Sequence, residues 1–125
     1  MASTLTALVI GEPGPELERA WAAGFFDGEG YVGCNLRWAG KKRYRRIDVQ
    51  VTQNDPEVLE RFRAAVGAGK VYGPYHTPKR ANPMWKYGIG SAEGVRHVLE
   101  VLRPYLSSIK TKQAEEALLR FSDWE

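Results

Sequence analysis

The sequence of 125 residues holds very few of the side chains that make disulfides or zinc sites: one cysteine, Cys34, and two histidines, His76 and His97. A lone cysteine excludes an internal disulfide and is compatible with a reducing compartment. One cysteine and two histidines cannot supply the four ligands of an ordinary structural zinc site.

Long apolar runs are also missing. The run from Ala7 to Ile10 is too short for the core of a signal peptide or for a membrane span. We therefore expect no membrane partner and an intracellular protein, in the cytoplasm, the nucleoid or an organelle, that is not secreted. The chain has no Ser-His-Asp set, Walker loop or dinucleotide-binding glycine turn, and we expect no small-molecule substrate.

The length suits a single domain with one core, and we expect residues 1–125 to form it, with residues 1–13 as a loose N-terminal lead-in. The formal net charge is +3 and the isoelectric point is near 9.1. This mildly basic balance favours a nucleic-acid partner only weakly, so the placement of the charges matters more than their sum.

Residues 21–30, WAAGFFDGEG, predict the last two turns of a helix that stops at two glycines. Residues with short side chains share one side of the helical wheel: Ala20, Ala23, Gly24 and Asp27. Large residues share a neighbouring side: Leu17, Trp21 and Phe25. The large stripe suggests burial against the chain's own core, and the small stripe would let another backbone come very close.

Two carboxylates lie at the end of this helix, Asp27 in its last turn and Glu29 just past it, although a helix C-terminus disfavours negative charge. If a second copy of the helix packs on the small stripe, up to four carboxylates converge. Such a cluster is stable only when it is protonated or holds cations, and oxygen ligands favour Mg²⁺. The alternative is that Asp27 caps nearby backbone and Glu29 is solvated in a turn, and the spacing alone does not decide between them.

Residues 22–30, AAGFFDGEG, resemble the LAGLIDADG signature of homing endonucleases, in the variant that ends Asp-Gly-Glu-Gly. The departures keep both carboxylates: Ala22 for the first leucine, Phe25 and Phe26 for the aliphatic pair, Gly28 for the second alanine and Glu29 for the second aspartate. The resemblance implies a metal-dependent DNA endonuclease of intron or intein mobility, in which two such helices each deliver one acid to the cleavage site.

Only one copy of the motif is present, so the resemblance implies a homodimer that cuts double-stranded DNA at a long palindromic or pseudo-palindromic site. It implies Mg²⁺ or Mn²⁺ as the cofactor, with Ca²⁺ as a non-cleaving substitute. The rival interpretation is a DNA- or RNA-binding protein on the same scaffold that does not cut, such as an intron maturase or a transcription factor. A third is an unrelated monomer with a fortuitous motif.

After Gly30 the apolar period changes to two, which predicts a strand, a turn at residues 39–42 and a second strand to about Gln53. Polar side chains alternate with the apolar ones and define an outer face that we predict to bind DNA, since arginine, asparagine and glutamine contact purine edges. Its residues are Gly33, Asn35, Arg37, Tyr44, Arg46, Asp48, Gln50 and Thr52, with Lys70, Tyr72 and Lys86 on the next strands. The alternative is an ordinary solvated hairpin.

Further elements follow in order: a helix from Asp55-Pro56, strands at about 70–75 and 84–90, a helix capped by Ser91 and a last helix after Gln113. This order predicts an α+β fold with an antiparallel sheet covered by helices on one face. The resemblance implies the same αββαββα order with a saddle-shaped sheet.

Candidate catalytic residues follow from both arguments. Glu29 is the predicted metal ligand, and the main-chain carbonyl of Gly28 is a further one. The resemblance adds Lys110, with Lys112 as a close competitor, to polarise the water network or the phosphate. It also adds Gln53 to position the attacking water. The alternative is that Lys110 is a loop lysine and Gln53 a helix-entry residue.

Overall fold

The computed structural model describes residues 10–124. Its elements follow in the order α2 (Glu16–Glu29), β1 (Gly30–Ala39), β2 (Lys42–Gln53), α3 (Pro56–Val66), β3 (Lys70–Tyr75), β4 (Met84–Ile89), α4 (Ala92–Leu102) and α5 (Ser108–Trp124). The predicted α+β order, with two strands after each of the first two helices, is confirmed.

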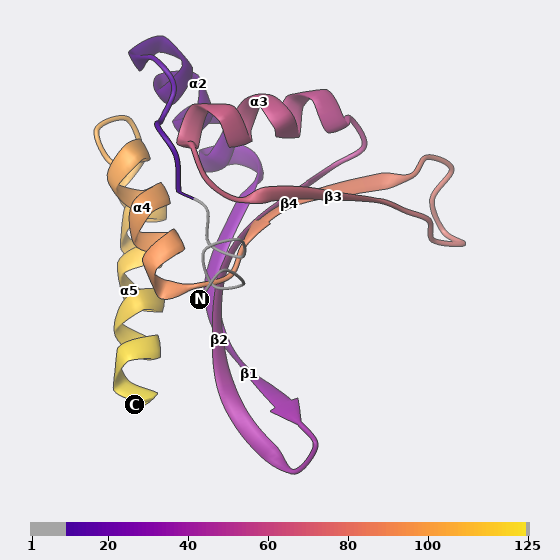
Figure 1. Ribbon diagram of the computed structural model, residues 1–125, viewed down its shortest axis with the longest axis vertical. Coiled ribbons are helices and arrows are strands. Elements are labelled where there is room, and N and C mark those ends of the chain that lie inside the picture. Colours follow the sequence, from indigo (N-terminus) through magenta and orange to yellow (C-terminus); the bar gives the residue numbers. More distant parts are fainter. Residues whose placement is uncertain (1–9, 125) are drawn as a thin grey trace.

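All four strands form one antiparallel sheet in the order β1-β2-β4-β3. The helices lie together on one side of it, while the β1–β2 and β3–β4 hairpins diverge and extend beyond the helices in two directions (Figure 1). The sheet is therefore strongly curved, and its outer face is left without a helical cover.

The core lies between the inner face of the sheet and the helices. Phe62 of α3 is at its centre, with ring centroids 5.9 Å from Phe26 of α2 and 4.9 Å from Tyr87 of β4. The Tyr87 hydroxyl donates a 2.8 Å hydrogen bond to the carbonyl of Ala68. A buried polar group that finds a partner avoids the free-energy penalty of an unmade hydrogen bond.

Local signals begin α3 and α4 where the sequence predicts them. Asp55 accepts the backbone N–H of Glu57 and caps α3, and Ser91 accepts that of Gly94 and caps α4. Gly67 ends α3 with a φ of 76°, a backbone conformation that glycine adopts without strain. None of the described helices is long and apolar enough to cross a bilayer.

Three sequence expectations need correction. Helix α2 includes Glu29, and α5 begins at Ser108, so Lys110 and Lys112 are helical instead of preceding the helix. The period of two after Gly30 also places Leu36 and Trp38 among the apolar residues that would face the core. They are exposed instead, because the β1–β2 hairpin extends past the helices that would cover them.

The predicted loose lead-in is described only in part. Residues 1–9 lie outside the described part of the chain. Ile10 forms a β-bridge with Ala68, and the Gly11 N–H donates to the carbonyl of Gly67 at 2.6 Å. The described end of the predicted loose segment is thus held against the end of α3.

Candidate functional site

One face of α2 is open along its whole length. Leu17 is 83% exposed, and Gly24 and Gly28 are exposed on the same side, seven and eleven residues further on. Apart from the adjoining residues and the nearby backbone of α2 itself, a Cβ atom added at either glycine would meet no atom of the described chain within 4 Å. Helical residues seven and eleven apart share a face, so these positions form a flat strip that could accept another helix.

This strip differs from the predicted small-residue stripe. Ala23 is fully buried in the chain's own core and is not available to a second helix, whereas Ala20 is half-buried at the edge of the strip. Leu17 was predicted to face the core and is exposed instead. The reason is that Ala22 and Phe26 pack against the core, so the buried face of α2 is centred on these residues and not on the stripe of large residues that includes Leu17.

Asp27 is engaged within the chain. Both of its carboxylate oxygens lie 3.2 Å from the backbone nitrogen of Ser107, which donates to them. Ser107 in turn accepts the Lys110 N–H through its hydroxyl, at 3.1 Å. Asp27 therefore caps backbone at the start of α5 and is not a free carboxylate. Capping of nearby backbone is one of the two roles that the sequence left open for Asp27.

Glu29, by contrast, is exposed at the last position of α2. The next residue, Gly30, has an ordinary φ of −86°, so it is not needed for a left-handed turn. It is needed for packing, because a Cβ atom there would collide with the Phe26 ring. The carbonyl of Gly28 belongs to the last turn, where carbonyl groups lack an intrahelical N–H partner.

The other two catalytic candidates lie at the same end of α2. Gly30 pairs with Val51, so Gln53 lies two residues further along the neighbouring strand. The Lys110 ammonium lies 5.7 Å from the centroid of the Phe26 ring. Phe26 is about one helical turn before Glu29 in α2. Lys112 is exposed. The structure thus brings Glu29, Gln53 and Lys110 to one region and turns Lys110, rather than Lys112, toward α2.

No complete set of metal-ligating side chains is found in the described part of the chain. Three or more histidine, cysteine, aspartate or glutamate side chains nowhere lie close enough together among the described residues to hold a metal ion. The oxygen donors that are present, the Glu29 carboxylate and the Gly28 carbonyl, are of the kind that Mg²⁺ prefers. These donors fit a divalent ion that takes its remaining ligands from water, phosphate or further protein groups.

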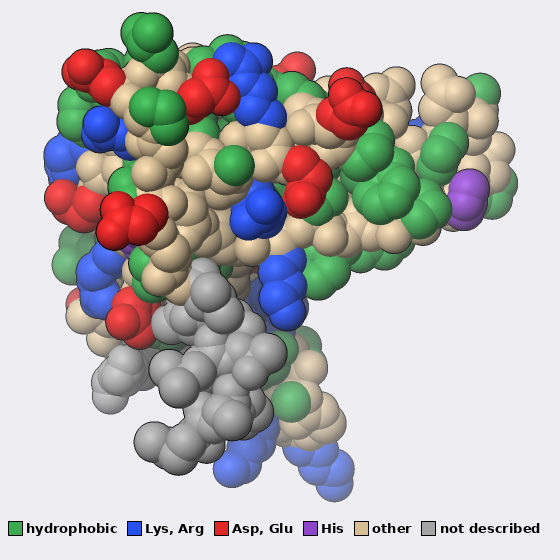
Figure 2. Space-filling model, turned by 45° about the horizontal axis from the view of Figure 1, so that its top comes forward, with side chains coloured by type: hydrophobic (Ala, Val, Ile, Leu, Met, Phe, Trp, Pro, Cys, Tyr) green, Lys and Arg blue, Asp and Glu red, His purple; other side chains and the backbone are tan. Residues whose placement is uncertain are grey.

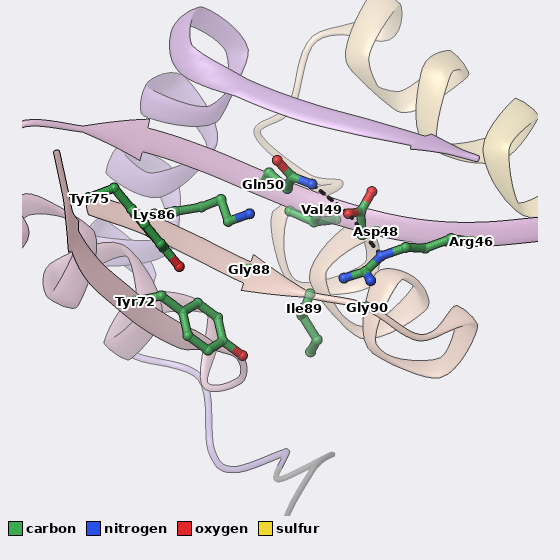
Figure 3. A pocket seen from close by; sticks show the side chains of 10 residues that line it. All are labelled: Arg46, Asp48, Val49, Gln50, Tyr72, Tyr75, Lys86, Gly88, Ile89 and Gly90. Carbon is green, nitrogen blue, oxygen red and sulfur yellow. Dashed lines mark hydrogen bonds and ion pairs between the residues drawn. The ribbon is translucent and has the colours of Figure 1, made fainter. Parts of the chain in front are cut away.

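The outer face of the sheet carries the second candidate site, a hollow of about 240 Å³. Figure 3 shows Arg46, Asp48 and Gln50 side by side on β2, with Tyr72, Tyr75 and Lys86 across from them on β3 and β4. The Gln50 amide donates to Asp48 at 2.6 Å, and the Nε of Arg46 lies 3.5 Å from the same carboxylate oxygen.

The predicted DNA-binding residues share this face but differ in exposure. Those that are exposed are Arg37, Tyr44, Arg46, Thr52, Lys70 and Tyr72; those half-buried are Gly33, Asn35, Gln50 and Lys86. Asp48 is the exception, since it is only 3% exposed. A side chain so deeply set cannot be a principal contact of a bulky ligand.

Two tyrosines of this face were missed. Tyr31 lies over Gly33 and accepts a 2.7 Å hydrogen bond from Asn35. Tyr31 is two residues before Gly33 in β1, so the alternation that places Gly33 on the outer face could have placed Tyr31 there too. Tyr75 follows a register shift between β3 and β4, and an irregularity of this kind cannot be found from a period of two.

Basic residues gather at the tip of the β1–β2 hairpin. Figure 2 shows Lys and Arg side chains at the lower projecting end of the molecule. The turn holds Lys41 and the start of β2 holds Lys42 and Arg43, all exposed. The Arg43 guanidinium lies 5.7 Å from the centre of the Trp38 ring. The tip is therefore a positive extension of the open face.

The chain matches no family model and no curated protein sequence. Solved structures are similar to it. One is the homing endonuclease I-CvuI in complex with an uncleaved DNA target in the presence of Mg²⁺. It superposes with a TM-score of 0.70 at 26% identity, and the match covers 86% of this chain and 67% of that chain. The homing endonuclease I-TnaI superposes with a TM-score of 0.64 at 20% identity, over 84% and 74%.

The LAGLIDADG homing endonuclease I-GzeII, in complex with its DNA target, has a TM-score of 0.65 at 17% identity. The match covers 84% of this chain but 36% of that one. This chain thus corresponds to about one third of the length of I-GzeII.

Proposed function

The chain has the fold of the LAGLIDADG homing endonucleases, as residues 22–30 predicted, and on that premise we propose that it is a site-specific endonuclease that cuts double-stranded DNA as a homodimer. The observation that carries the proposal is the open strip of α2, which ends at the exposed Glu29. A second copy packed on this strip about a twofold axis would bring the two Glu29 carboxylates together.

In the dimer, each Glu29 carboxylate and Gly28 carbonyl would hold a divalent ion, Mg²⁺ or Mn²⁺, while Ca²⁺ would bind without supporting cleavage. A bound ion of this kind lowers the pKa of a water nucleophile and stabilises charge on the phosphate. Two structures of I-CvuI on DNA, one in the presence of Mg²⁺ and one of Ca²⁺, support a divalent ion in this fold.

The chain's own side chains have separate roles in the reaction. The Lys110 ammonium, beside the last turn of α2, would stabilise negative charge on the scissile phosphate. The Gln53 amide, at the end of β2, would orient the attacking water. Asp27 would act indirectly, because its bond to Ser107 fixes the turn of α5 that carries Lys110.

The outer face of the sheet would lie in the major groove, which admits a two-stranded ribbon. The basic tip, Lys41, Lys42 and Arg43, would contact phosphates beyond it. Twofold symmetry of the protein then requires a palindromic or pseudo-palindromic site. A DNA substrate places the protein's action inside the cell, where genomic or organellar DNA is present, and intron or intein mobility would be its biological context.

The proposal is tested with a plasmid library that carries randomised duplex DNA. The protein is incubated with the library in Mg²⁺, and linearised plasmids are sequenced at the cut. We expect a set of related, twofold-symmetric sites cut on both strands in Mg²⁺ and bound uncut in Ca²⁺. Sites that are selected by binding but never cut would instead establish a non-cleaving DNA-binding protein. Absence of any selected site would overturn the proposal altogether.

A further inference from the structure

The hollow on the outer face contains an arrangement that DNA affinity alone does not explain. A carboxylate, that of Asp48, lies at the centre of a surface proposed to face a polyanion, and its side chain is only 4% exposed. A buried charge is costly unless other groups compensate it. Two groups do so here: Arg46 and Gln50, the next outward residues on either side along β2.

Glycines surround Asp48 across the sheet. Gly33 of β1 pairs with Asp48, and Gly90 lies beyond Ile89, the partner of Val49. The Arg46 guanidinium occupies the space above Gly90, with Nη2 3.4 Å from where a Cβ atom would be, and Tyr31 occupies the space above Gly33. The absence of side chains at the two glycines lets Arg46 and Tyr31 fold inward and bury the carboxylate.

The hydrogen bond from Gln50 and the ion pair with Arg46 decide which atoms these two neighbours of Asp48 present outward. An ionised carboxylate only accepts hydrogen bonds, so the Gln50 amide must turn its nitrogen toward Asp48. The Gln50 oxygen and the second N–H then remain for a ligand. Arg46 directs Nε toward Asp48 and keeps its two terminal nitrogens, on a side chain that is 50% exposed.

We propose that Asp48 is a specificity-determining positioning residue, which holds Arg46 to read a guanine and Gln50 to read an adenine in the major groove. The free fork of an arginine matches the O6 and N7 acceptors of guanine, and an amide oxygen with an adjacent N–H matches the N6 donor and N7 acceptor of adenine. The inference rests on the proposed DNA-binding function, which does not itself assign any base.

Asp48 also discourages the wrong contacts. Without it, Arg46 and Gln50 could turn to the phosphates, which are the same in every sequence and carry no base information. The negative charge of Asp48 repels phosphate, and its carboxylate engages one nitrogen of Arg46 and one of Gln50. Asp48 thus lowers non-specific attraction while it strengthens base preference, which is a form of selection against wrong partners.

The test compares the base preferences of Asp48→Asn and the wild-type protein, measured by binding selection from randomised duplex DNA in Ca²⁺. The asparagine has nearly the same shape but no negative charge, so the one oxygen that both Arg46 and Gln50 contact becomes a neutral and weaker acceptor. We expect guanine and adenine preference to fall about tenfold at the two positions that Arg46→Ala and Gln50→Ala also affect. Preferences elsewhere should persist, and affinity for random DNA should stay constant or rise.

Glu60→Gln is the matched control. It removes one negative charge on α3, where Glu60 pairs with Arg63 on the helical side, and it should leave the base profile unchanged. A uniform gain of affinity by Asp48→Asn with an unchanged profile would overturn the inference and leave the proposed function intact. A wild-type protein that selects no sequence at all would overturn both.

A second variant keeps the test decisive if Asp48→Asn does not fold. Arg46→Lys retains the positive charge beside Asp48 but lacks the planar fork. We expect it to keep its affinity for random DNA and to lose guanine preference about tenfold at the same position. Retention of that preference would show that the oriented fork is not what reads the base. The double variant Asp48→Asn/Arg46→Ala should lose no more at that position than Arg46→Ala alone.

Discussion

Asp27 and Ser107 are eighty residues apart in the sequence, yet both carboxylate oxygens of Asp27 accept the Ser107 backbone N–H at 3.2 Å. This contact joins the end of α2 to the start of α5. A negative charge is favourable at a helix N-terminus, so Asp27 stabilises α5 although it is poorly placed in its own helix. The two motif carboxylates therefore differ in their surroundings: Asp27 accepts a backbone N–H of its own chain, whereas Glu29 is exposed at the surface.

Replacing Asp27 with alanine removes the cap of α5. We expect the free energy of unfolding to fall by about 1–2 kcal/mol, as for the loss of a helix cap. Urea denaturation followed by circular dichroism measures the change. Asp123→Ala, at an exposed position near the other end of α5, is the control and should change stability by less than about 0.5 kcal/mol. Equal effects of the two substitutions would show that the Ser107 contact contributes nothing.

The open strip of α2 predicts a steric effect on assembly. Gly24→Leu adds a side chain where an added Cβ meets no atom of the described chain within 4 Å apart from the adjoining residues and the nearby backbone of α2 itself. The single chain should therefore fold at least as well, since leucine favours a helix more than glycine does. The added bulk should separate two packed helices, and sedimentation should show dimers becoming monomers. Ala64→Leu, at an exposed position of α3, should leave the assembly unchanged. A Gly24→Leu protein with an undiminished dimer would place the interface elsewhere.

Tyr87 predicts how stability depends on alkaline pH. Burial raises the pKa of its hydroxyl above the ordinary value. The folded state then keeps its proton at a pH where the unfolded state has lost it. The stabilisation is complete below about pH 10, the unfolded value, and is lost as pH rises above it, by up to about 1.4 kcal/mol per pH unit.

Tyr87→Phe is the comparison for that measurement. It removes the hydrogen bond to Ala68 and should destabilise the protein by about 1–2 kcal/mol at pH 7. Its stability should then fall less steeply than that of the wild type between pH 10 and 11. Parallel pH curves for the two proteins would refute the assignment to Tyr87.

The basic hairpin tip predicts how binding depends on salt. Lys42→Gln removes one exposed positive charge, and the loss of one phosphate neutralisation should reduce the slope of log affinity against log salt by about 0.9. The weakening should be the same for all DNA sequences, because phosphates carry no base information. Arg96→Gln on α4, which covers the opposite side of the sheet, should leave the slope unchanged. An effect limited to particular sequences would mean that Lys42 reads bases.

The sequence predicts the elements well because each has strong local signals. Asp55-Pro56 begins α3 and Gly67 ends it, and the alternation along β2 places Ile47 and Val51 in the core. The face of α2 is harder to predict. Small residues suit both a second helix and a crowded core, and only the packing of Phe26 shows that Ala23 is buried while Leu17 is exposed.

The location of the candidate site residues was predictable in part. The motif and the resemblance name Glu29, Gln53 and Lys110, and the fold brings them to one end of α2. No local pattern could show that Asp27 bonds to Ser107 or that Asp48 is buried between Gly33 and Gly90. Those facts depend on contacts between distant segments, which periodicity does not encode.

The central claim is that an exposed carboxylate at the end of a self-pairing helix holds the metal ion that cuts DNA. Glu29→Gln keeps the size of the side chain and removes the charge. With the selected DNA site in Mg²⁺, we expect its rate of double-strand cleavage to fall by about two orders of magnitude or more, while its affinity in Ca²⁺ stays within a few fold of wild type. Cleavage by Glu29→Gln at the wild-type rate would contradict the account.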